Sequence, residues 1–295
     1  MNALEISNLT KKYVGITAVD NLSIKIPQGS IFGILGPNGS GKTTTLACIT
    51  GLIEPSSGKF KWFDNADNET DNKQIGAIIE TPNFFPNFTA LKNMQLVAKI
   101  KGIENTEQID QLLKRLGIYE RRNSQFYSFS LGMKSRLALA SALLGDPKVL
   151  ILDEPTNGLD PEGIAFVRNL IIEEAKKQKT IIIASHILDE VQKVCTHIVL
   201  LKNGKMLASG KINEILSTKN TYIIESDNNQ LLSELIIRGG FANVINISNV
   251  TLEISLNSQQ EIKEISKIAA LNNILITKLS EKQNSLEEEF LKLVK

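Results

Sequence analysis

Apolar and polar side chains alternate along residues 4–9 and 22–26, a pattern that predicts two strands with one buried face each. A turn at 27–29, which contains a proline and a glycine, follows the second of them. Residues 30–35 then form a continuous apolar run, as expected for a central strand that is buried on both faces. This run leads directly into a glycine-rich loop and a predicted helix that begins at Lys42.

Helical periodicity dominates residues 89–145, where apolar side chains recur every three or four positions. Gly117 ends one of these apolar faces, as glycine often does at the end of a helix. Beyond this region, short β-branched runs at 149–152 and 180–184 predict two parallel strands. A crossover helix at about 161–177 is expected to join them.

The composition changes after about residue 215, where Asn and Ser become more frequent and the apolar runs become shorter. We therefore predict a first domain at 1–215, with a helical subdomain at about 86–146, and an α+β accessory domain at 219–295 of the order βαββαβ. Its expected elements are strand 221–225, helix 230–237, a hairpin of 244–247 and 250–256, helix 258–271 with Ser258 and Glu261 spaced as a capping box, strand 274–279 and a terminal helix 285–294.

Length and composition fit one large domain and one small one, since the chain has 295 residues of which 42% are hydrophobic. The net charge of +1 gives no electrostatic basis for binding nucleic acid or an anionic membrane. Cys48 and Cys195 lack metal-binding spacing and are expected to be reduced core residues of a cytoplasmic protein. The chain shows no signal pattern and no run of ~20 apolar residues, so we expect a soluble protein that reaches a membrane only through a partner chain.

The glycine-rich loop fits the phosphate-binding pattern GxxxxGK[ST] in full and follows a predicted buried strand. Its backbone N–H groups are expected to hold phosphate oxygens at the start of the next helix. Lys42 would contact the β- and γ-phosphates of ATP, and the Thr43 hydroxyl would bind Mg²⁺. The expected nucleotide-binding residues of this segment are Gly36, Pro37, Asn38, Gly39, Ser40, Gly41, Lys42, Thr43 and Thr44.

An acidic pair, Asp153 and Glu154, ends the predicted strand 149–152. Asp153 is placed to hold Mg²⁺ through water, and Glu154 is placed to polarise the attacking water as a general base. Taken alone, the pair could also be an acidic strand end that faces solvent. The phosphate-binding loop in the same chain favours nucleotide hydrolysis.

Two further segments indicate a family. Residues 152–160, LDEPTNGLD, resemble the joined Walker B and D-loop segments of ATP-binding cassette (ABC) proteins, and residues 128–136, SFSLGMKSR, resemble the ABC signature. The resemblance covers residues 1 to about 215. It implies an α/β fold: a P-loop ABC ATPase core with a mostly parallel sheet, an antiparallel β portion and a helical subdomain, followed here by a small C-terminal α+β domain.

The signature segment carries a further implication. Ser130, Leu131, Gly132 and Met133 stand where the family most often has Ser-Gly-Gly-Gln, and Met133 lacks the hydrogen-bonding amide of that Gln. In the family this segment reaches across an interface to the nucleotide held by a second copy. The resemblance therefore implies a homodimer of nucleotide-binding domains that forms on ATP binding, and it places Asp160 of the D-loop among the nucleotide-binding residues.

Three single residues also match family positions. His186 follows the predicted strand 180–184 as the family's switch histidine does, which implies a catalytic contact with the γ-phosphate. Tyr13 resembles the aromatic residue that stacks on adenine, although an exposed strand aromatic is an alternative. Glu80 stands after the strand 75–79, where the family usually has a Gln that contacts Mg²⁺; a solvated Glu is the alternative there.

Glu80 and the segment SLGMKSR resemble one branch of the family, the bacitracin- and lantibiotic-type ATPase subunits that export peptide antibiotics or give immunity to them. This resemblance implies one or two integral membrane permease subunits as partners, no nucleic acid, and a place on the inner face of the cell membrane. An ABC exporter for another cargo (drug, lipid or ion) is an alternative, and a non-transport ABC ATPase is a more distant one.

A cluster of aromatic residues, Phe84, Phe85 and Phe88, follows Glu80. Clustered aromatic side chains commonly pack at the junction of two subdomains. They also suit a groove in which a short helix of a membrane partner docks. The sequence supports both interpretations, and they are compatible with each other.

Overall fold

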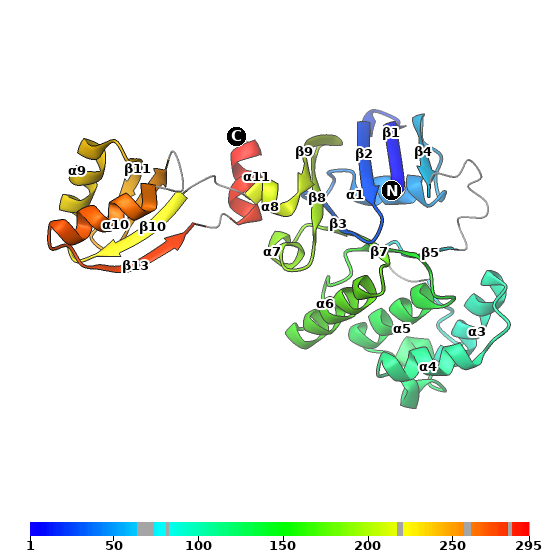
Figure 1. Ribbon diagram of the computed structural model, residues 1–295. Coiled ribbons are helices and arrows are strands. Elements are labelled where there is room, and N and C mark those ends of the chain that lie inside the picture. The colour runs from blue at the N-terminus through cyan, green and yellow to red at the C-terminus, as the bar shows by residue number, and fades with distance from the viewer. Residues whose placement is uncertain (64–73, 81–82, 217–220, 257–260, 283–284, 295) are drawn as a thin grey trace. The chain divides into compact units, whose positions relative to one another are not determined.

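A computed structural model describes residues 1–63, 74–80, 83–216, 221–256, 261–282 and 285–294. The chain forms two compact units, Met1–Ile212 and Asn213–Lys295 (Figure 1).

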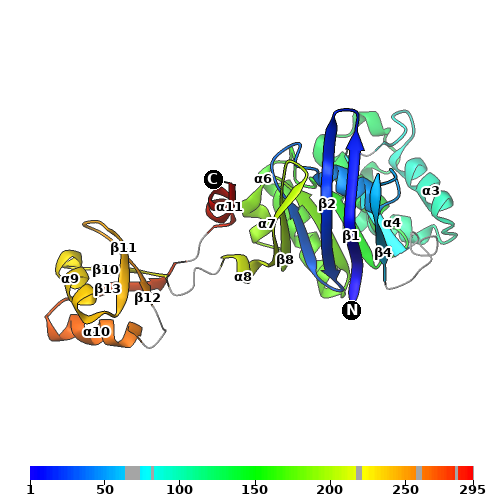
Figure 2. The same ribbon diagram turned by 90° about the horizontal axis from the view of Figure 1, so that it is seen from above.

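A three-stranded antiparallel sheet forms the outer layer of the first unit, with its strands side by side in the order β2-β1-β4 (Figure 2). The alternating segments of the sequence lie inside these strands, which are longer than the pattern suggested. The buried side chain of Trp62 holds this sheet against helix α1, because its Nε1 donates to the Ile49 carbonyl at 2.9 Å. The elements are β1 (Asn2–Tyr13), β2 (Ile16–Pro27), β4 (Ser57–Trp62) and helix α1 (Lys42–Ile49).

A six-stranded sheet forms the centre of the first unit in the order β5-β6-β7-β3-β8-β9. All neighbouring strands are parallel except β8 and β9. Every residue of β3, β6 and β7 is buried, as continuous apolar runs predict. The strands are β3 (Ile31–Leu35), β5 (Ile75–Ile78), β6 (Val149–Asp153), β7 (Thr180–Ser185), β8 (His197–Lys202) and β9 (Lys205–Lys211).

Helices α3, α4 and α5 group together in the first unit (Figure 1). Lys101, at the end of α3, fixes the end of α5 by donating to the carbonyls of Ser141 and Leu144 at 2.8 and 2.9 Å. Helices α6 and α7 follow the strands that end in Asp153 and Ser185. The helices are α3 (Ala90–Lys101), α4 (Glu107–Arg115), α5 (Leu131–Leu143), α6 (Pro161–Lys176), α7 (Leu188–Gln192) and α8 (Ile212–Leu216), with single 3-10 turns at Tyr119–Arg121 and Phe126–Ser128.

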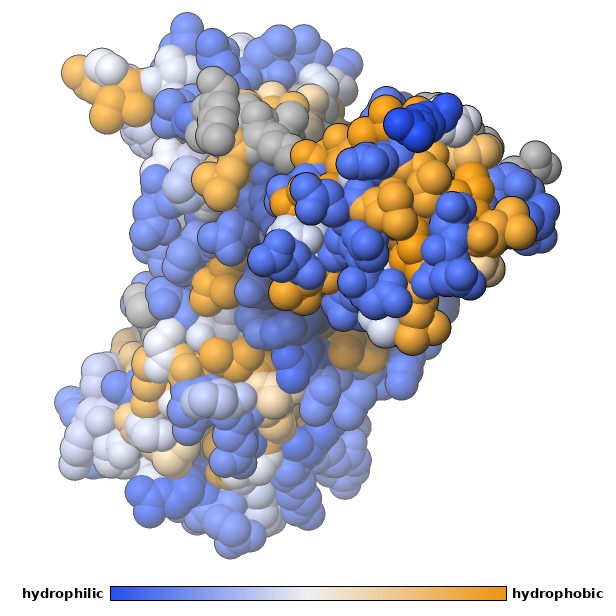
Figure 3. All heavy atoms as spheres, turned by 90° about the vertical axis from the view of Figure 1, so that its left-hand side faces the viewer, coloured by the Kyte–Doolittle hydropathy of each residue, from blue (hydrophilic) through white to orange (hydrophobic). Residues whose placement is uncertain are grey.

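The second unit contains a four-stranded antiparallel sheet in the order β11-β12-β10-β13. Its core joins apolar side chains of the sheet to those of α9 and α10, including Ile224, Leu232 and Ile265. Apolar side chains also gather on the face of this unit that Figure 3 turns toward the viewer. The predicted cap residue Ser258 lies outside the described residues. The elements are β10 (Thr221–Ser226), α9 (Asn229–Gly239), β11 (Ala242–Ile247), β12 (Leu252–Leu256), α10 (Glu261–Leu271), β13 (Ile276–Glu281) and α11 (Leu286–Val294).

Candidate nucleotide-binding and catalytic site

The glycine-rich loop joins β3 to α1 and packs tightly against its neighbours. Gly36 and Gly41 have φ values of 155° and 101°, and a Cβ on either would come within 2.2 Å of the Leu201 carbonyl oxygen or 2.4 Å of the Ala18 carbonyl oxygen. Only glycine fits at these positions. Among the described residues no side chain caps the N-terminus of α1, so the N–H groups of its first turn are available to an anion.

Lys42 is buried, and three oxygens surround its amino group. Nζ donates to the carbonyls of Gly36 at 2.9 Å and Pro37 at 3.3 Å, and it lies 3.3 Å from Oε1 of Glu154. The residues Asn38, Gly39, Thr43 and Thr44 line the same hollow as Lys42 and Glu154. The structure therefore brings together Lys42, the predicted phosphate-binding lysine, and Glu154, the predicted general base.

Asp153 ends β6 with one oxygen bound and one unpaired. The Thr43 hydroxyl donates to Oδ2 at 2.8 Å, whereas Oδ1 is buried without a hydrogen-bond partner among the described residues. Burial raises the pKa of Asp153, and the nearby charge of Glu154 adds to this, against the hydrogen bond from Thr43. An unpaired carboxylate oxygen beside a hydroxyl is a donor set that suits a hard divalent cation. Thus these two residues fit the predicted magnesium site.

Glu154 and His186 follow neighbouring parallel strands and meet at their carboxyl ends. His186 Nδ1 lies 2.8 Å from Glu154 Oε2. The backbone N–H of Glu154 donates to the Ala184 carbonyl at 2.9 Å, and its φ of 47° is unusual for a residue with a Cβ. Such backbone strain is concentrated at functional sites. The two strands thus hold a carboxylate against an imidazole beside Lys42.

Glu80 lies at the end of β5 with a φ of 57° and an exposed side chain. It lines one hollow with Thr43, Asp153 and Glu154. The Glu80 backbone also lowers the pKa of Asp153, against the effect of burial. Both the metal-binding and the solvated interpretation of the Glu80 side chain fit this position at the edge of the predicted magnesium site.

The signature segment occupies a different surface hollow. Ser130 caps α5 by accepting a hydrogen bond from the Met133 N–H at 3.3 Å, and Asp160 caps α6 by accepting one from the Gly163 N–H at 2.8 Å. Both caps, with Gly132, line one hollow that shares no described residue with the hollow around Lys42. Leu131 is exposed and lines another hollow together with Asp153 and Glu154. Within one chain, Ser130, Gly132 and Asp160 therefore do not line the hollow around Lys42, whereas Leu131 shares a hollow with the acidic pair.

Tyr13 is not among the described residues that line the hollow around Lys42. Its partner in the register of β1 and β2 is Ile16, which does line that hollow. The Tyr13 ring is half-exposed, and Lys11 Nζ lies 5.2 Å from its centroid. Four residues that line this hollow were not predicted from the sequence: Ile16, Thr17, Ala18 and Asn203. Asn203 and Gly204 form an Asn-Gly pair, which is typical of a tight turn between two antiparallel strands. The pair therefore indicates the turn between β8 and β9, but it does not indicate that this turn lies beside the loop that contains Lys42.

The aromatic cluster divides between interior and surface. Phe84 packs edge to face on Phe126 with centroids 5.1 Å apart, whereas Phe85 contacts Phe88 and is exposed, as is Tyr127. Both interpretations of the cluster therefore keep support. Phe84 packs inside the unit, and Phe85 and Tyr127 offer aromatic surface.

Comparisons with known proteins agree with this geometry. A family model described as ABC transporter matches residues 19–157. The bacitracin transport ATP-binding protein BcrA of Bacillus licheniformis is 37% identical over 99% of this chain and 97% of its own length. The lantibiotic transport ATP-binding protein SrtF of Streptococcus pyogenes is 38% identical over 78% of this chain and 98% of its own length. The chain belongs to the ABC transporter ATP-binding proteins.

Solved ABC cassettes have the same fold. The structure of an ATP-binding subunit of an ABC transporter matches with a TM-score of 0.66 and 30% identity, covering 72% of this chain and 91% of that one. A dimeric cassette in a post-hydrolysis state, bound to ADP and phosphate, matches with a TM-score of 0.64 and 26% identity over 71% of this chain and 98% of that one. These matches confirm the predicted fold class and the family.

The family assignment settles the general activity. This ABC protein is the ATP-binding subunit of a transporter and hydrolyses ATP in transport. Among the residues that the structure describes, no helix has the length and apolar character that crossing a membrane requires.

Proposed function

We propose that this subunit drives the export of, or immunity to, a peptide antibiotic of the bacitracin or lantibiotic type. The names of BcrA and SrtF support this cargo, because both relatives match along nearly their whole length. Glu80 and the segment SLGMKSR point to the same branch of the family. The chain would work on the cytoplasmic face of the membrane with one or two separate permease subunits.

The observation that carries the catalytic proposal is the cluster of Lys42, Glu154 and His186 at the carboxyl ends of parallel strands. The first-turn N–H groups of α1 and the Lys42 ammonium would bind the β- and γ-phosphates of ATP. Thr43 and Asp153, with Glu80 beside them, would hold Mg²⁺, which neutralises developing charge on the phosphates. Since no described group of three His, Cys, Asp or Glu residues forms a metal site, phosphate and water oxygens would complete the coordination.

Glu154 is the proposed general base. Its carboxylate would accept a proton from water while that water attacks the γ-phosphorus and the bond to the ADP oxygen breaks. His186 would hold the carboxylate in place through the 2.8 Å contact and, once ATP is bound, contact the γ-phosphate. Lys42 would stabilise the negative charge that develops on the phosphate oxygens.

The signature hollow would complete the site of a second copy. Gly132 lies in the first turn of α5, where a Cβ would meet no atom of the other described elements within 4 Å. Glycine inside a helix costs about 1 kcal/mol relative to alanine, and packing within this chain gives no reason for it. Close approach of a partner's nucleotide to Ser130 and the start of α5 would give one. This supports an ATP-dependent homodimer.

The exposed aromatic surface of Phe85 and Tyr127 is the proposed contact with a permease. A short helix of the membrane partner would place apolar side chains against these rings. The second unit, proposed as an accessory domain at 219–295, has its own core and would add stability or contacts outside the catalytic site.

The variant Glu154→Gln tests the catalytic proposal. It keeps the shape of the side chain but removes the base, so it should bind ATP and dimerise while turnover falls by about 100-fold or more. ATPase assays and size-exclusion chromatography with and without ATP measure both properties. Wild-type turnover in this variant would exclude Glu154 as the base.

The cargo needs a cellular test. Cells that carry the native permease subunits and the Glu154→Gln variant should become sensitive to bacitracin or a lantibiotic, compared with cells that carry the unchanged chain. Sensitivity to an unrelated drug serves as the control. A phenotype confined to other drugs or to lipids would overturn the peptide-antibiotic proposal and leave the ATPase activity untouched.

A further inference from the structure

Helix α7 carries little stability of its own. It spans five residues, and its N-cap residue Ile187 has an apolar side chain that cannot accept a hydrogen bond from the first turn. Such a short helix is held by tertiary contacts rather than by its own hydrogen bonds. Its buried residue Val191 packs against Gly33, where a Cβ would come within 2.9 Å of Val191 Cγ1. His186 lies just ahead of α7, so its position depends on what fixes this helix.

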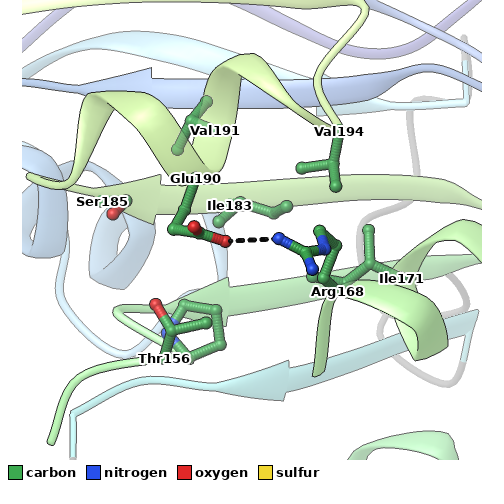
Figure 4. Close-up of a pocket in the computed structure, with 9 residues that line it drawn as sticks. Thr156, Arg168, Ile171, Ile183, Ser185, Glu190, Val191 and Val194 are labelled. Atoms are coloured by element: carbon green, nitrogen blue, oxygen red, sulfur yellow. Dashed lines mark hydrogen bonds and ion pairs between the residues drawn. The ribbon is translucent and has the colours of Figure 1, made fainter. Parts of the chain in front are cut away.

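An ion pair joins α7 to α6. Arg168 Nη1 on α6 lies 3.3 Å from Glu190 Oε2 on α7, and Figure 4 shows the two side chains pointing toward each other. Their side chains are 31% and 21% exposed, so water screens the pair only in part. Helix α6 begins at its cap Asp160. The pair therefore links the helix that follows the D-loop to the helix that follows His186.

The ion pair also borders a small cavity between the catalytic loops. Thr156 lies two residues after Glu154 and lines this cavity together with Ser185, the residue before His186 (Figure 4). The Ser185 hydroxyl accepts a hydrogen bond from the Ile187 N–H at 3.0 Å and shapes the turn that presents His186. Movement of α7 relative to α6 would thus change the contact between His186 and Glu154.

We propose that Arg168 and Glu190 form a positioning pair for ATP hydrolysis. The pair holds the turn around His186 in its position next to Glu154. It also fixes His186 and Glu154 relative to Asp160, the residue that caps α6. The inference rests on the catalytic roles proposed for Glu154 and His186. Neither Arg168 nor Glu190 touches the reacting atoms. ATP binding, which depends on the loop around Lys42, does not require the pair, whereas the hydrolysis step does.

The test compares Arg168→Met with Lys193→Met in the purified full-length protein. Lys193 Nζ lies 2.7 Å from Glu190 Oε1, but both residues belong to the same segment, so this second variant removes a Glu190 contact without unlinking α6. Arg168→Met should lower kcat by about tenfold with little change in KM for ATP, because a displacement of ~1 Å costs up to about 100-fold in rate. Lys193→Met and Arg168→Lys should keep kcat near that of the unchanged chain.

A double-mutant cycle identifies the link itself. Glu190→Gln should lower kcat as Arg168→Met does, and the double variant should be no slower than either single variant, because both break one contact. Losses that multiply would overturn the inference, as would an equal loss in Lys193→Met. His186→Ala in the same assay separates the two proposals. Turnover retained in His186→Ala contradicts the catalytic role, whereas its loss together with an active Arg168→Met contradicts only the positioning pair.

Discussion

Two ion-pair clusters on helix α6 have the same chemistry but different surroundings. Glu174, near the end of the helix, is 0% exposed and contacts Arg115 at 2.6 Å, Lys177 at 2.8 Å and Lys179 at 2.6 Å. Arg168, near the middle, is 31% exposed and contacts Glu190 at 3.3 Å. Glu174 and its partner Lys179 are buried, so removing one of these two leaves buried charge. The comparison indicates that the Glu174 cluster contributes mainly to the stability of the fold, whereas the Arg168–Glu190 pair mainly positions the catalytic loops.

The largest effect is expected from Glu174→Gln. This change leaves the nearly buried Lys179 beside a neutral amide, with the exposed Asp146 at 2.6 Å as its remaining anionic partner. Breaking a buried ion pair typically costs about 3–5 kcal/mol. Urea unfolding at neutral pH measures the free energy of unfolding, with Glu173→Gln on the exposed neighbouring carboxylate as the matched control. A loss of unfolding free energy below about 1 kcal/mol would mean that the ion pairs of Glu174 behave like exposed surface pairs. The difference in stability between this cluster and the Arg168–Glu190 pair would then disappear.

The pH dependence of stability gives the next test. Burial alone would raise the pKa of Glu174, but hydrogen bonds from Lys177, Lys179 and Arg115 outweigh it and lower the pKa from 4.5 to about 2. Between these values the unfolded chain binds a proton that the folded chain does not. Stability should therefore fall as the pH drops from about 5 to 2, by up to about 3 kcal/mol.

The variant Glu174→Gln isolates this contribution, since it has no carboxyl group to titrate. The difference in unfolding free energy between the unchanged chain and Glu174→Gln should shrink by about 2–3 kcal/mol between pH 6 and pH 3. A difference that stays constant with pH would show that the pKa of Glu174 is the same in the folded and unfolded chain.

The same cluster shows what sequence alone could not predict. Glu173 and Glu174 are adjacent in a charged run, yet their side chains are 60% and 0% exposed. Helical spacing places Glu174 on the buried face of α6. The sequence does not show the cations that pair with a carboxylate there, because Arg115 comes from α4 and Lys179 from the residue before β7. The Arg168–Glu190 pair was missed for a similar reason, since its partners lie 22 residues apart on different helices.

Features set by local chemistry were predicted well. The buried strands β3, β6 and β7 follow from continuous apolar runs, and the loop before Lys42 follows from its spacing. Because parallel strands align their carboxyl ends, Asp153 and His186 could be expected near each other. The contact between His186 and Glu154, and the hollow that includes Asn203, required the packed fold.

The smallest effect on stability is expected from Arg168→Met. A partly exposed ion pair contributes about 0–1 kcal/mol, so the unfolding free energy should change by no more than this, although kcat falls. Urea unfolding of Arg168→Met, Lys193→Met and the unchanged chain in one buffer measures the change. If Arg168→Met lowered the unfolding free energy as much as Glu174→Gln does, both clusters would contribute mainly to stability. A small loss with reduced turnover would show that one helix uses a buried carboxylate for stability and a half-exposed arginine to align the catalytic loops.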